Sequence, residues 1–341
     1  MKPSRRDVLK VGFSALAGTT LGKLMIPKQD PPQKRIVTGS GDYVYEVHHD
    51  WLTPPPGVVW GDTHGVVQDS EGRIYIAHTV HPSSTKPHAI VVFDHKGQFV
   101  TSWGEEYAGG AHGLDIRYEG SEEFLYHCDI KHRHVTKTDL NGKVVWQKGM
   151  PTEPGVYKEE NQWCPTNVAF APNGDIFVGD GYGSSYVHRY TMDGEYKSLV
   201  CGPGSGEGQV SCPHGLWVDR RGETPYLVVA DRSNHRLQYF TLDGKFVKFV
   251  TGGMRMPCHL HFRNGKMLVP DLSSVVTILG DDNQVLAQLC DGDPSNLRGA
   301  PRSQFIPGKF IHPHASIWIN GDDIIVVEWV PIGRVTLLKK V

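Results

Sequence analysis

Three histidines recur in one local setting at wide intervals along the chain. His112, His214 and His314 each follow alanine or proline, and each precedes glycine or alanine. Imidazole nitrogens are common zinc ligands, and three of them with a fourth position left open form the usual catalytic zinc site. The same donors also suit other divalent transition metals. The three segments therefore predict one metal centre, with Zn2+ as its expected ion, if the fold brings them together.

The elements that must position these histidines are six copies of a repeated unit. Each copy opens with a short strand, passes through a glycine turn to an apolar strand that generally ends in an acidic residue, and adds two more strands. The openings are Thr63-His64-Gly65-Val66, Ala111-His112-Gly113-Leu114, Pro165-Thr166-Asn167-Val168, Pro213-His214-Gly215-Leu216, Pro257-Cys258-His259-Leu260 and Pro313-His314-Ala315-Ser316. Successive openings are roughly 44 to 56 residues apart, which is the spacing of propeller blades.

Strand periodicity within the copies predicts an all-β, six-bladed β-propeller with four antiparallel strands in each blade. The first copy shows it in residues 73–78, 89–94 and 99–103. Asn-Gly and Asp-Gly pairs, which tolerate positive φ in hairpin turns, separate the strands of later copies. The last copy supplies only three strands, whereas residues 43–48 form a strand before the first copy. We expect this N-terminal strand to complete the sixth blade and close the ring.

The first strand of each blade lines the central channel of a propeller, so equivalent positions of different copies converge there. His112, His214 and His314 occupy the same register in the second, fourth and sixth copies, that is, on alternate blades. His64 has this register in the first copy, and His259 marks the fifth beside a cysteine, so both are weaker candidates for the metal. The alternative interpretation of any one such histidine is that it only hydrogen-bonds ordered water.

Two further residues follow the acidic ends of second strands. Tyr182 comes shortly after Asp180 and Arg232 directly after Asp231, so both are expected at the rim of the channel. A tyrosine beside a metal can act as a base because the cation favours its phenolate, and arginine can bind a carboxylate through two hydrogen bonds. The recurring acids themselves are expected to stabilise turns.

These segments resemble a known family. The copies are similar to NHL repeats, and roughly residues 60 to 341 resemble the lyase domain of peptidylglycine α-amidating enzymes, most strongly through Cys164-Pro165-Thr166-Asn167-Val168, Phe177-Val178-Gly179-Asp180-Gly181-Tyr182 and Val229-Ala230-Asp231-Arg232-Ser233-Asn234. The resemblance implies that His112, His214 and His314 bind zinc. It also implies that Tyr182 is the catalytic base and that Arg232 positions the substrate or stabilises charge. In that family the lyase cleaves the carbon–nitrogen bond of a carbinolamide, giving an amide and glyoxylate.

Three positions depart from the family pattern. The family has a second catalytic arginine at the end of the first blade's second strand, where this chain has His78-Thr79-Val80-His81. An aspartate that helps hold structural calcium is replaced by Ala315, which argues against Ca2+, and the disulfide partner expected after Tyr182 is Gly183. The missing arginine bears on the substrate more than on the metal, so the resemblance leaves the substrate open.

The N-terminus resembles a twin-arginine export signal. Arg5 and Arg6 precede an apolar run, residues 11–24, that is too short and too weakly apolar to span a bilayer securely. We expect residues 1–26 to be the signal, residues 27–41 a spacer and residues 42–341 the propeller. The twin-arginine translocase would then deliver a folded protein, without a stable membrane span, to the periplasm or the cell exterior.

Composition narrows the partners. A net charge of -2 with 21% charged residues gives no strong field to attract nucleic acid, so we expect none as a partner. Six cysteines in an oxidising compartment permit disulfides. Cys201 and Cys212 bracket a glycine-rich loop and are either a pair or two buried thiols.

Three functions fit these features. The first is a metal-dependent lyase, or a related metalloenzyme, acting on a small molecule or a peptide. The second is a calcium-dependent lactonase or similar hydrolase, which needs glutamate, asparagine and aspartate on the channel strands. The third is a non-catalytic NHL interaction module, whose binding face would use rim aromatics expected to be exposed, namely Trp60, Trp103, Trp163 and Tyr186.

Overall fold

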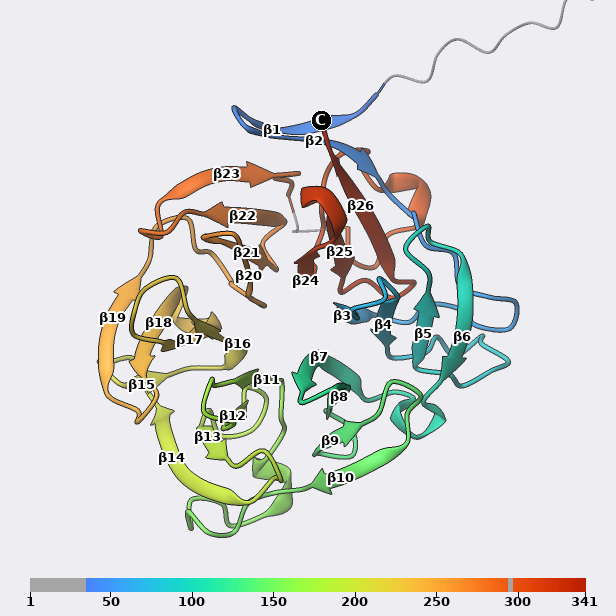
Figure 1. The fold of residues 1–341 in the computed structure, drawn as a ribbon. Helices are drawn as coiled ribbons and strands as arrows, with labels where there is room; N and C mark the ends of the chain where they lie inside the picture. Colours follow the sequence, from blue (N-terminus) through green and yellow to red (C-terminus); the bar gives the residue numbers. More distant parts are fainter. Residues whose placement is uncertain (1–34, 294–296) are drawn as a thin grey trace, which may run out of the picture. The chain divides into compact units, whose positions relative to one another are not determined.

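Six sheets, antiparallel except for one short parallel pair in the third, are arranged radially around a common centre (Figure 1). The computed structural model describes residues 35–293 and 297–341. Within these ranges the regular structure consists of β-strands and short 3-10 helices. The all-β, six-bladed propeller predicted from the repeats is therefore confirmed.

The first five blades follow chain order from the centre outward, so the first strand of each faces the axis (Figure 1). The first two blades are β3 (Thr63–Gln68), β4 (Ile74–His78), β5 (Ile90–Phe93), β6 (Phe99–Trp103) and β7 (Ala111–Glu119), β8 (Glu122–Asp129), β9 (His134–Thr138), β10 (Val144–Lys148). The next two are β11 (Asn167–Phe170), β12 (Ile176–Gly179), β13 (Val187–Tyr190), β14 (Tyr196–Pro203), with β15 (Gln209–Val210) beside it, and β16 (Pro213–Asp219), β17 (Tyr226–Asp231), β18 (Arg236–Thr241), β19 (Phe246–Val250). The fifth blade is β20 (His261–Arg263), β21 (Lys266–Asp271), β22 (Val275–Leu279), β23 (Val285–Leu289). The 3-10 helices are η1 (Glu105–Tyr107), η2 (Glu160–Gln162), η3 (Arg232–Asn234), η4 (Arg302–Gln304) and η5 (Asn320–Asp322).

The sixth blade joins the two ends of the propeller. Its C-terminal strands are β24 (Pro313–Trp318), β25 (Ile324–Glu328) and β26 (Arg334–Lys340), and β2 (Tyr43–His48) pairs with β26. This confirms the predicted ring closure. A further strand, β1 (Val37–Ser40), pairs with the outer edge of β2 in residues that were expected to be spacer. The short run was missed because its residues are too few to show a period.

Glycines allow the inner strands to approach one another closely. A Cβ on Gly113 would lie 2.3 Å from the backbone oxygen of Thr166, and a Cβ on Gly215 would lie 2.6 Å from that of Cys258. Gly65 is equally confined by Leu114. The His-Gly pairs therefore have a packing reason: each glycine lets the next blade come close enough to contact the histidine before it.

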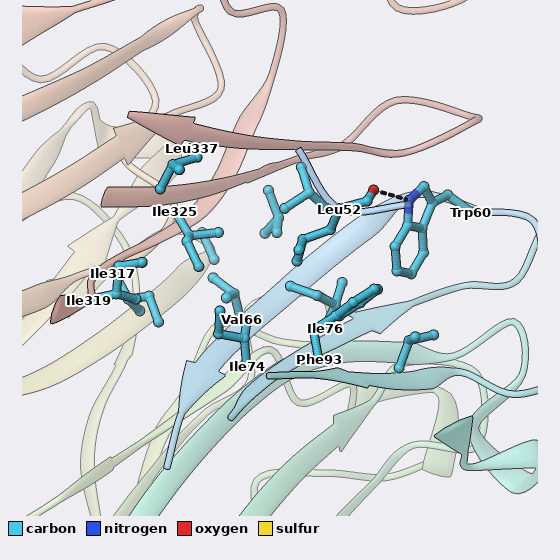
Figure 2. Close-up of a cluster of buried hydrophobic side chains, with 14 of the residues drawn as sticks. Leu52, Trp60, Val66, Ile74, Ile76, Phe93, Ile317, Ile319, Ile325 and Leu337 are labelled. Atoms are coloured by element: carbon cyan, nitrogen blue, oxygen red, sulfur yellow. Dashed lines mark hydrogen bonds between the residues drawn. The ribbon is translucent and has the colours of Figure 1, made fainter. Parts of the chain in front are cut away.

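Apolar side chains fill the spaces between neighbouring blades. In Figure 2, Val66, Ile74 and Ile76 of the first blade face Ile325 and Leu337 of the sixth. This packing includes Trp60, whose indole nitrogen donates to the carbonyl of Leu52 (Figure 2). Because burying apolar surface stabilises by about 25 cal/mol per Å2, these clusters hold the blades in register.

Some surface expectations are wrong. Trp60 and Trp163 were expected to be exposed at the rim, yet their exposed fractions are 6% and 1%. The ring of Trp60 packs between the first and sixth blades, and the ring of Trp163 packs between the second and third. Cys201 and Cys212 are free thiols, like the other four cysteines.

The predicted export signal and most of the spacer lie outside the described residues. Among residues 35–293 and 297–341, no helix is long and apolar enough to cross a membrane.

Candidate metal centre

Four imidazole rings meet where the inner strands converge. The ring centroids of His112, His214 and His314 are 4.7 to 4.9 Å apart. His64 lies 4.7 Å from His112 and 4.5 Å from His314. All four residues are buried. The structure thus brings the three main candidates together and places His64 among them at the same spacing.

Each of these rings is oriented by a backbone carbonyl of the next blade. His112 Nδ1 lies 2.9 Å from the oxygen of Thr166, and His214 Nδ1 lies 2.7 Å from that of Cys258. His314 Nδ1 lies 2.8 Å from the oxygen of His64, which in turn directs its own Nδ1 to Ala111, 3.1 Å away. Since a carbonyl oxygen only accepts, every Nδ1 carries the ring proton.

The remaining ring nitrogens are therefore acceptors that face one another. His314 Nε2 lies 3.1 Å from His112 Nε2, although neither nitrogen has a proton to donate in this tautomer. Two lone pairs at hydrogen-bond distance repel unless a cation or a proton lies between them. The donor set fits a divalent metal, because the support of each ligand by a hydrogen bond from its other nitrogen is typical of metal-bound histidine.

Burial keeps these histidines uncharged. It lowers the pKa of His112, His214 and His314 well below the ordinary value, and neighbouring charges lower it further. Burial also lowers the pKa of His64, to about 4. Near neutral pH all four rings are neutral, which is the form that binds metals.

Tyr182 and Arg232 stand at this centre. The hydroxyl of Tyr182 donates to His214 Nε2 at 3.0 Å and lies 3.3 Å from His112 Nε2, while the residue remains 39% exposed. Arg232 Nη1 donates to the same hydroxyl oxygen at 3.2 Å, and its guanidinium lies 5.0 Å from the centroid of the Tyr182 ring. Removal from water raises the pKa of Tyr182, and the charge of Arg232 opposes this. The Tyr182 hydroxyl thus accepts a hydrogen bond from Arg232 and donates one to His214.

The fifth blade contributes a thiol, not an imidazole, to the group. Cys258 occupies the histidine register, and its Sγ lies 3.9 Å from the unprotonated Nε2 of His214, so Cys258, His214 and His314 could together hold an ion. Burial raises the pKa of the Cys258 thiol to about 12. His259 is one residue further along; it borders the small pocket that His64, His214 and His314 line, and it also lines a cavity of about 130 Å3 with His261. The structure does not bring His259 into the group of four rings.

A second rim arginine was not anticipated from the sequence. Arg298 Nη2 donates to both carboxylate oxygens of Asp62, at 2.8 and 2.9 Å, and its guanidinium stacks 3.8 Å from the centroid of the Trp329 ring. Asp62 is two residues from His64, and its amide donates to the hydroxyl of Thr79 at 3.0 Å. Arg298 therefore stands beside the segment where the family arginine is missing. It lies between β23 and β24, outside the repeat register, so no periodic signal points to it.

Sequence comparison relates the chain to amidating enzymes. No family model matches. The chain is 29% identical over 238 residues to a peptidylglycine alpha-amidating monooxygenase of Rattus norvegicus, covering 60% of this chain and 23% of the relative. It is 25% identical over 270 residues to peptidyl-alpha-hydroxyglycine alpha-amidating lyase 1 of Drosophila melanogaster, covering 69% and 47%. The chain spans less than half the length of each of these relatives.

Structure comparison agrees on the fold. A streptogramin B lyase structure aligns with a TM-score of 0.57 at 12% identity, covering 86% of this chain and 98% of that one. At this identity the likeness shows the fold alone. The chain is thus a β-propeller whose sequence is similar to part of the amidating lyases and monooxygenases.

Proposed function

We propose that this protein is a metal-dependent carbon–nitrogen lyase of the amidating-lyase type. The observation that carries the proposal is the set of unprotonated Nε2 atoms facing one another, with the hydroxyl of Tyr182 3.0 Å from one of them. His112, His214 and His314 would hold the ion, with His64 as a further donor or as support. Zinc is the expected ion, and at this place it would supply a Lewis acid that polarises the hydroxyl oxygen of the substrate.

The chain's own groups account for the proton transfers. Tyr182 would remove the proton from the carbinolamide hydroxyl, and the hydrogen bond from Arg232 would stabilise the resulting phenolate. As the hydroxyl oxygen becomes a carbonyl, the carbon–nitrogen bond breaks and the amide nitrogen takes up a proton. The products of a hydroxyglycine substrate would be an amide and glyoxylate. No co-reactant is needed for this balance.

Two arginines favour a substrate with a carboxylate. Besides burial, which is the main cause, the positive charges of Arg298 and Arg232 lower the pKa of His64. Both guanidinium groups therefore affect the electrostatic potential at the same centre. The Nε of each is buried without a hydrogen-bond partner. A carboxylate that reached either guanidinium group would gain charge-assisted hydrogen bonds, each contributing about 1.5–3 kcal/mol, and at Arg298 it would compete with Asp62, which already accepts two hydrogen bonds from Nη2. Arg298 would thereby take over the task that an arginine of the first blade performs in the family.

Two alternatives have less support. A lactonase-like hydrolase would need carboxylate and amide ligands at the centre. The nearby carboxylate of Asp115 instead accepts a hydrogen bond from the amide of Asn167 at 2.6 Å. An interaction module would use exposed rim aromatics, but Trp60 and Trp163 are buried. Histidine nitrogens, a phenol and a guanidinium at one centre are the features of an enzyme site.

The location belongs to the same proposal. We infer export by the twin-arginine route to the periplasm or the cell exterior, on the grounds of Arg5, Arg6 and the apolar run that follows. Fractionation of the native host should find the folded protein outside the cytoplasm. Replacing both arginines with lysine should retain it inside, and unchanged export of that variant would contradict the route.

The decisive experiment is metal analysis joined to an activity assay. Protein purified from its native host should contain zinc and release glyoxylate from an α-hydroxyglycine peptide. The ion held by His112, His214 and His314 is called the axial ion below. A His214→Ala variant should lose both this ion and the release of glyoxylate. Folded protein without metal would contradict the metal centre, whereas zinc-loaded protein that releases no glyoxylate would contradict the substrate.

A further inference from the structure

A second group of metal-binding side chains stands at the end of the second blade. Asp129 ends β8, His134 begins β9 as its cross-strand partner, and His132 lies in the turn between them. One ligand atom of each residue lies within 4.8 Å of the other two. The Oδ2 of Asp129 is 2.8 Å from His132 Nδ1 and 3.9 Å from His134 Nε2.

The two oxygens of Asp129 have separate surroundings. Oδ1 accepts the backbone N–H groups of Lys131 and His132, at 2.9 and 2.8 Å, and so holds the turn. Oδ2 faces the two imidazoles. The carboxylate is fully buried, whereas the His132 side chain is 43% exposed, so the group is reachable from solvent on one side. A rigid oxygen donor is thus fixed opposite two nitrogen donors.

Comparison of the blades shows what is special here. In the fourth blade the acid at this place is Asp231, and its cross-strand partner Arg236 donates to it at 2.7 Å. In the sixth blade Glu328 is paired in the same way with the buried Arg334. A permanent guanidinium charge neutralises those acids and repels a metal cation. In the second blade a titratable imidazole replaces the arginine, and the turn adds another.

The tautomer of His134 leaves unprotonated the nitrogen that faces Asp129, although a metal ion would have to displace the amide of Gln147 from it. The side-chain nitrogen of Gln147 lies 3.2 Å from His134 Nε2, which therefore accepts, and Nδ1 faces the hydroxyl of Thr136 at 3.1 Å. Burial lowers the pKa of His134, so the ring is neutral near pH 7. The rings of His132 and His134 are nearly parallel, 13° apart in plane with centroids 6.0 Å apart. If the Gln147 amide turned over, its oxygen would offer a fourth donor.

We propose that Asp129, His132 and His134 bind a second divalent ion of the zinc class, distinct from the axial one. One carboxylate oxygen and two imidazole nitrogens are a donor set that suits Zn2+, Co2+ or Ni2+ and is too poor in oxygen for Ca2+ or Mg2+. The role is structural. Asp129 is the cross-strand partner of Ala111, the residue before His112, so an ion here would fasten the end of the strand that carries an axial histidine.

Zinc titration of the full-length protein tests the proposal. Metal-stripped protein, titrated with zinc chloride by calorimetry, should take up two ions per chain. His132→Gln should lower the affinity of one site at least 100-fold and leave the axial site and the catalysed rate unchanged. Because the His132 side chain is 43% exposed, this variant should fold. His95→Gln, a change at an exposed histidine in a turn of the first blade, is the matched control and should bind two ions.

The two sites are told apart by crossing the variants. His214→Ala should lose the axial ion and keep the one at Asp129, and the two changes together should leave none. Cobalt in the His214→Ala protein should give visible absorption bands that His132→Gln removes. If His214→Ala protein binds no ion, or if His132→Gln still binds two, the second site does not exist, whatever the outcome for the lyase.

Discussion

At the scale of single residues, the two nitrogens of each axial histidine perform different tasks. Nδ1 donates to a carbonyl of the neighbouring blade, at 2.9 Å from His112 and at 2.8 Å from His314. Nε2 points to the shared centre. The orientation of each ligand thus depends on the adjacent blade. A change at a supporting position should weaken metal binding less than the loss of a ligand, because support typically accounts for about 10–100-fold in affinity.

The first prediction separates ligands from support at the centre. His112→Ala, His214→Ala and His314→Ala should each lower the affinity of the axial site for zinc at least 100-fold, since each removes one of three ligands. His64→Gln should lower it by only about 10-fold, because three imidazoles remain. Titration by calorimetry measures both effects. Equal losses for all four variants would make His64 a full ligand.

The second prediction concerns the phenol. Tyr182→Phe should lower kcat by about 10²–10⁴-fold, the usual contribution of a positioned acid or base, while zinc content stays unchanged. The ring is retained and only the hydroxyl that contacts His214 Nε2 at 3.0 Å is lost, so folding should not suffer. Steady-state kinetics and metal analysis of the same sample check this. A variant with unaltered kcat would remove Tyr182 from the proton transfers.

The third prediction tests the arginine that the sequence did not reveal. Arg298→Gln should raise KM for a carboxylate substrate by about 10–100-fold, because a charge-assisted hydrogen bond is lost, and should affect the methyl ester of that substrate much less. Arg302→Gln is the matched control, since Arg302 lies nearby in sequence but pairs with Asp50. Equal effects on acid and ester would show that Arg298 only holds Asp62 in place.

At the scale of strands, the centre exists because the inner strands pack closely. Gly113 has no room for a side chain, since an added Cβ would lie 2.3 Å from the oxygen of Thr166. That same oxygen accepts the Nδ1 proton of His112. The strand contact and the ligand orientation are therefore one structural feature.

The fourth prediction follows from this contact. Gly113→Ala should lower the free energy of unfolding by about 1–3 kcal/mol, as overpacking does elsewhere, because backbone must move to admit the methyl group. It should also weaken axial zinc binding, since the acceptor of His112 shifts. Gly149→Ala, at a glycine with open space around it, is the control and should change neither quantity. Urea unfolding measures the first effect, and a neutral result would contradict the close packing.

At the scale of the whole molecule, buried neutral histidines make stability depend on pH. Burial lowers the pKa of His49 to about 4 and the pKa values of His78 and His188 to about 3. In addition, Nδ1 of His78 accepts the N–H groups of Gly61 and Val80, so a proton on this nitrogen would displace both hydrogen bonds. In the unfolded chain these rings take up protons near pH 6.5.

The fifth prediction is a loss of stability on acidification. Between pH 6.5 and its pKa in the folded state, each such histidine is protonated in the unfolded chain but not in the folded one. The free energy of unfolding therefore falls by about 1.4 kcal/mol per pH unit for each of them as the pH is lowered. Above pH 6.5 this contribution is constant. Asp180 opposes the trend, because burial raises its pKa to about 6 and the folded state then takes up a proton first.

Urea unfolding between pH 8 and pH 4 measures this slope. His188→Phe keeps an aromatic ring in the cluster around Trp163 and removes one titrating group. Its slope should be shallower than that of the unaltered protein by about 1.4 kcal/mol per pH unit. A stability that stays flat or rises below pH 6.5 would contradict the prediction.

The sequence by itself determined the six blades, the closing strand and the convergence of His112, His214 and His314. These features are periodic: the hydrophobic pattern and the histidine register repeat with the blade, and a propeller carries equivalent positions to one axis. The strand β1, the burial of Trp60 and the absence of disulfides were decided by the tertiary structure, because each depends on which surfaces happen to meet. The same is true of Arg298.

Arg298 shows the limit most clearly. It lies in a loop between two blades, where no period relates it to the other copies, and only the folded chain sets it on Trp329 and against Asp62. The tautomers of the axial rings were likewise undetermined until the carbonyls of the next blades were in place. Repetition along a chain predicts where equivalent residues go, whereas contacts between non-equivalent residues depend on the path of every loop between them.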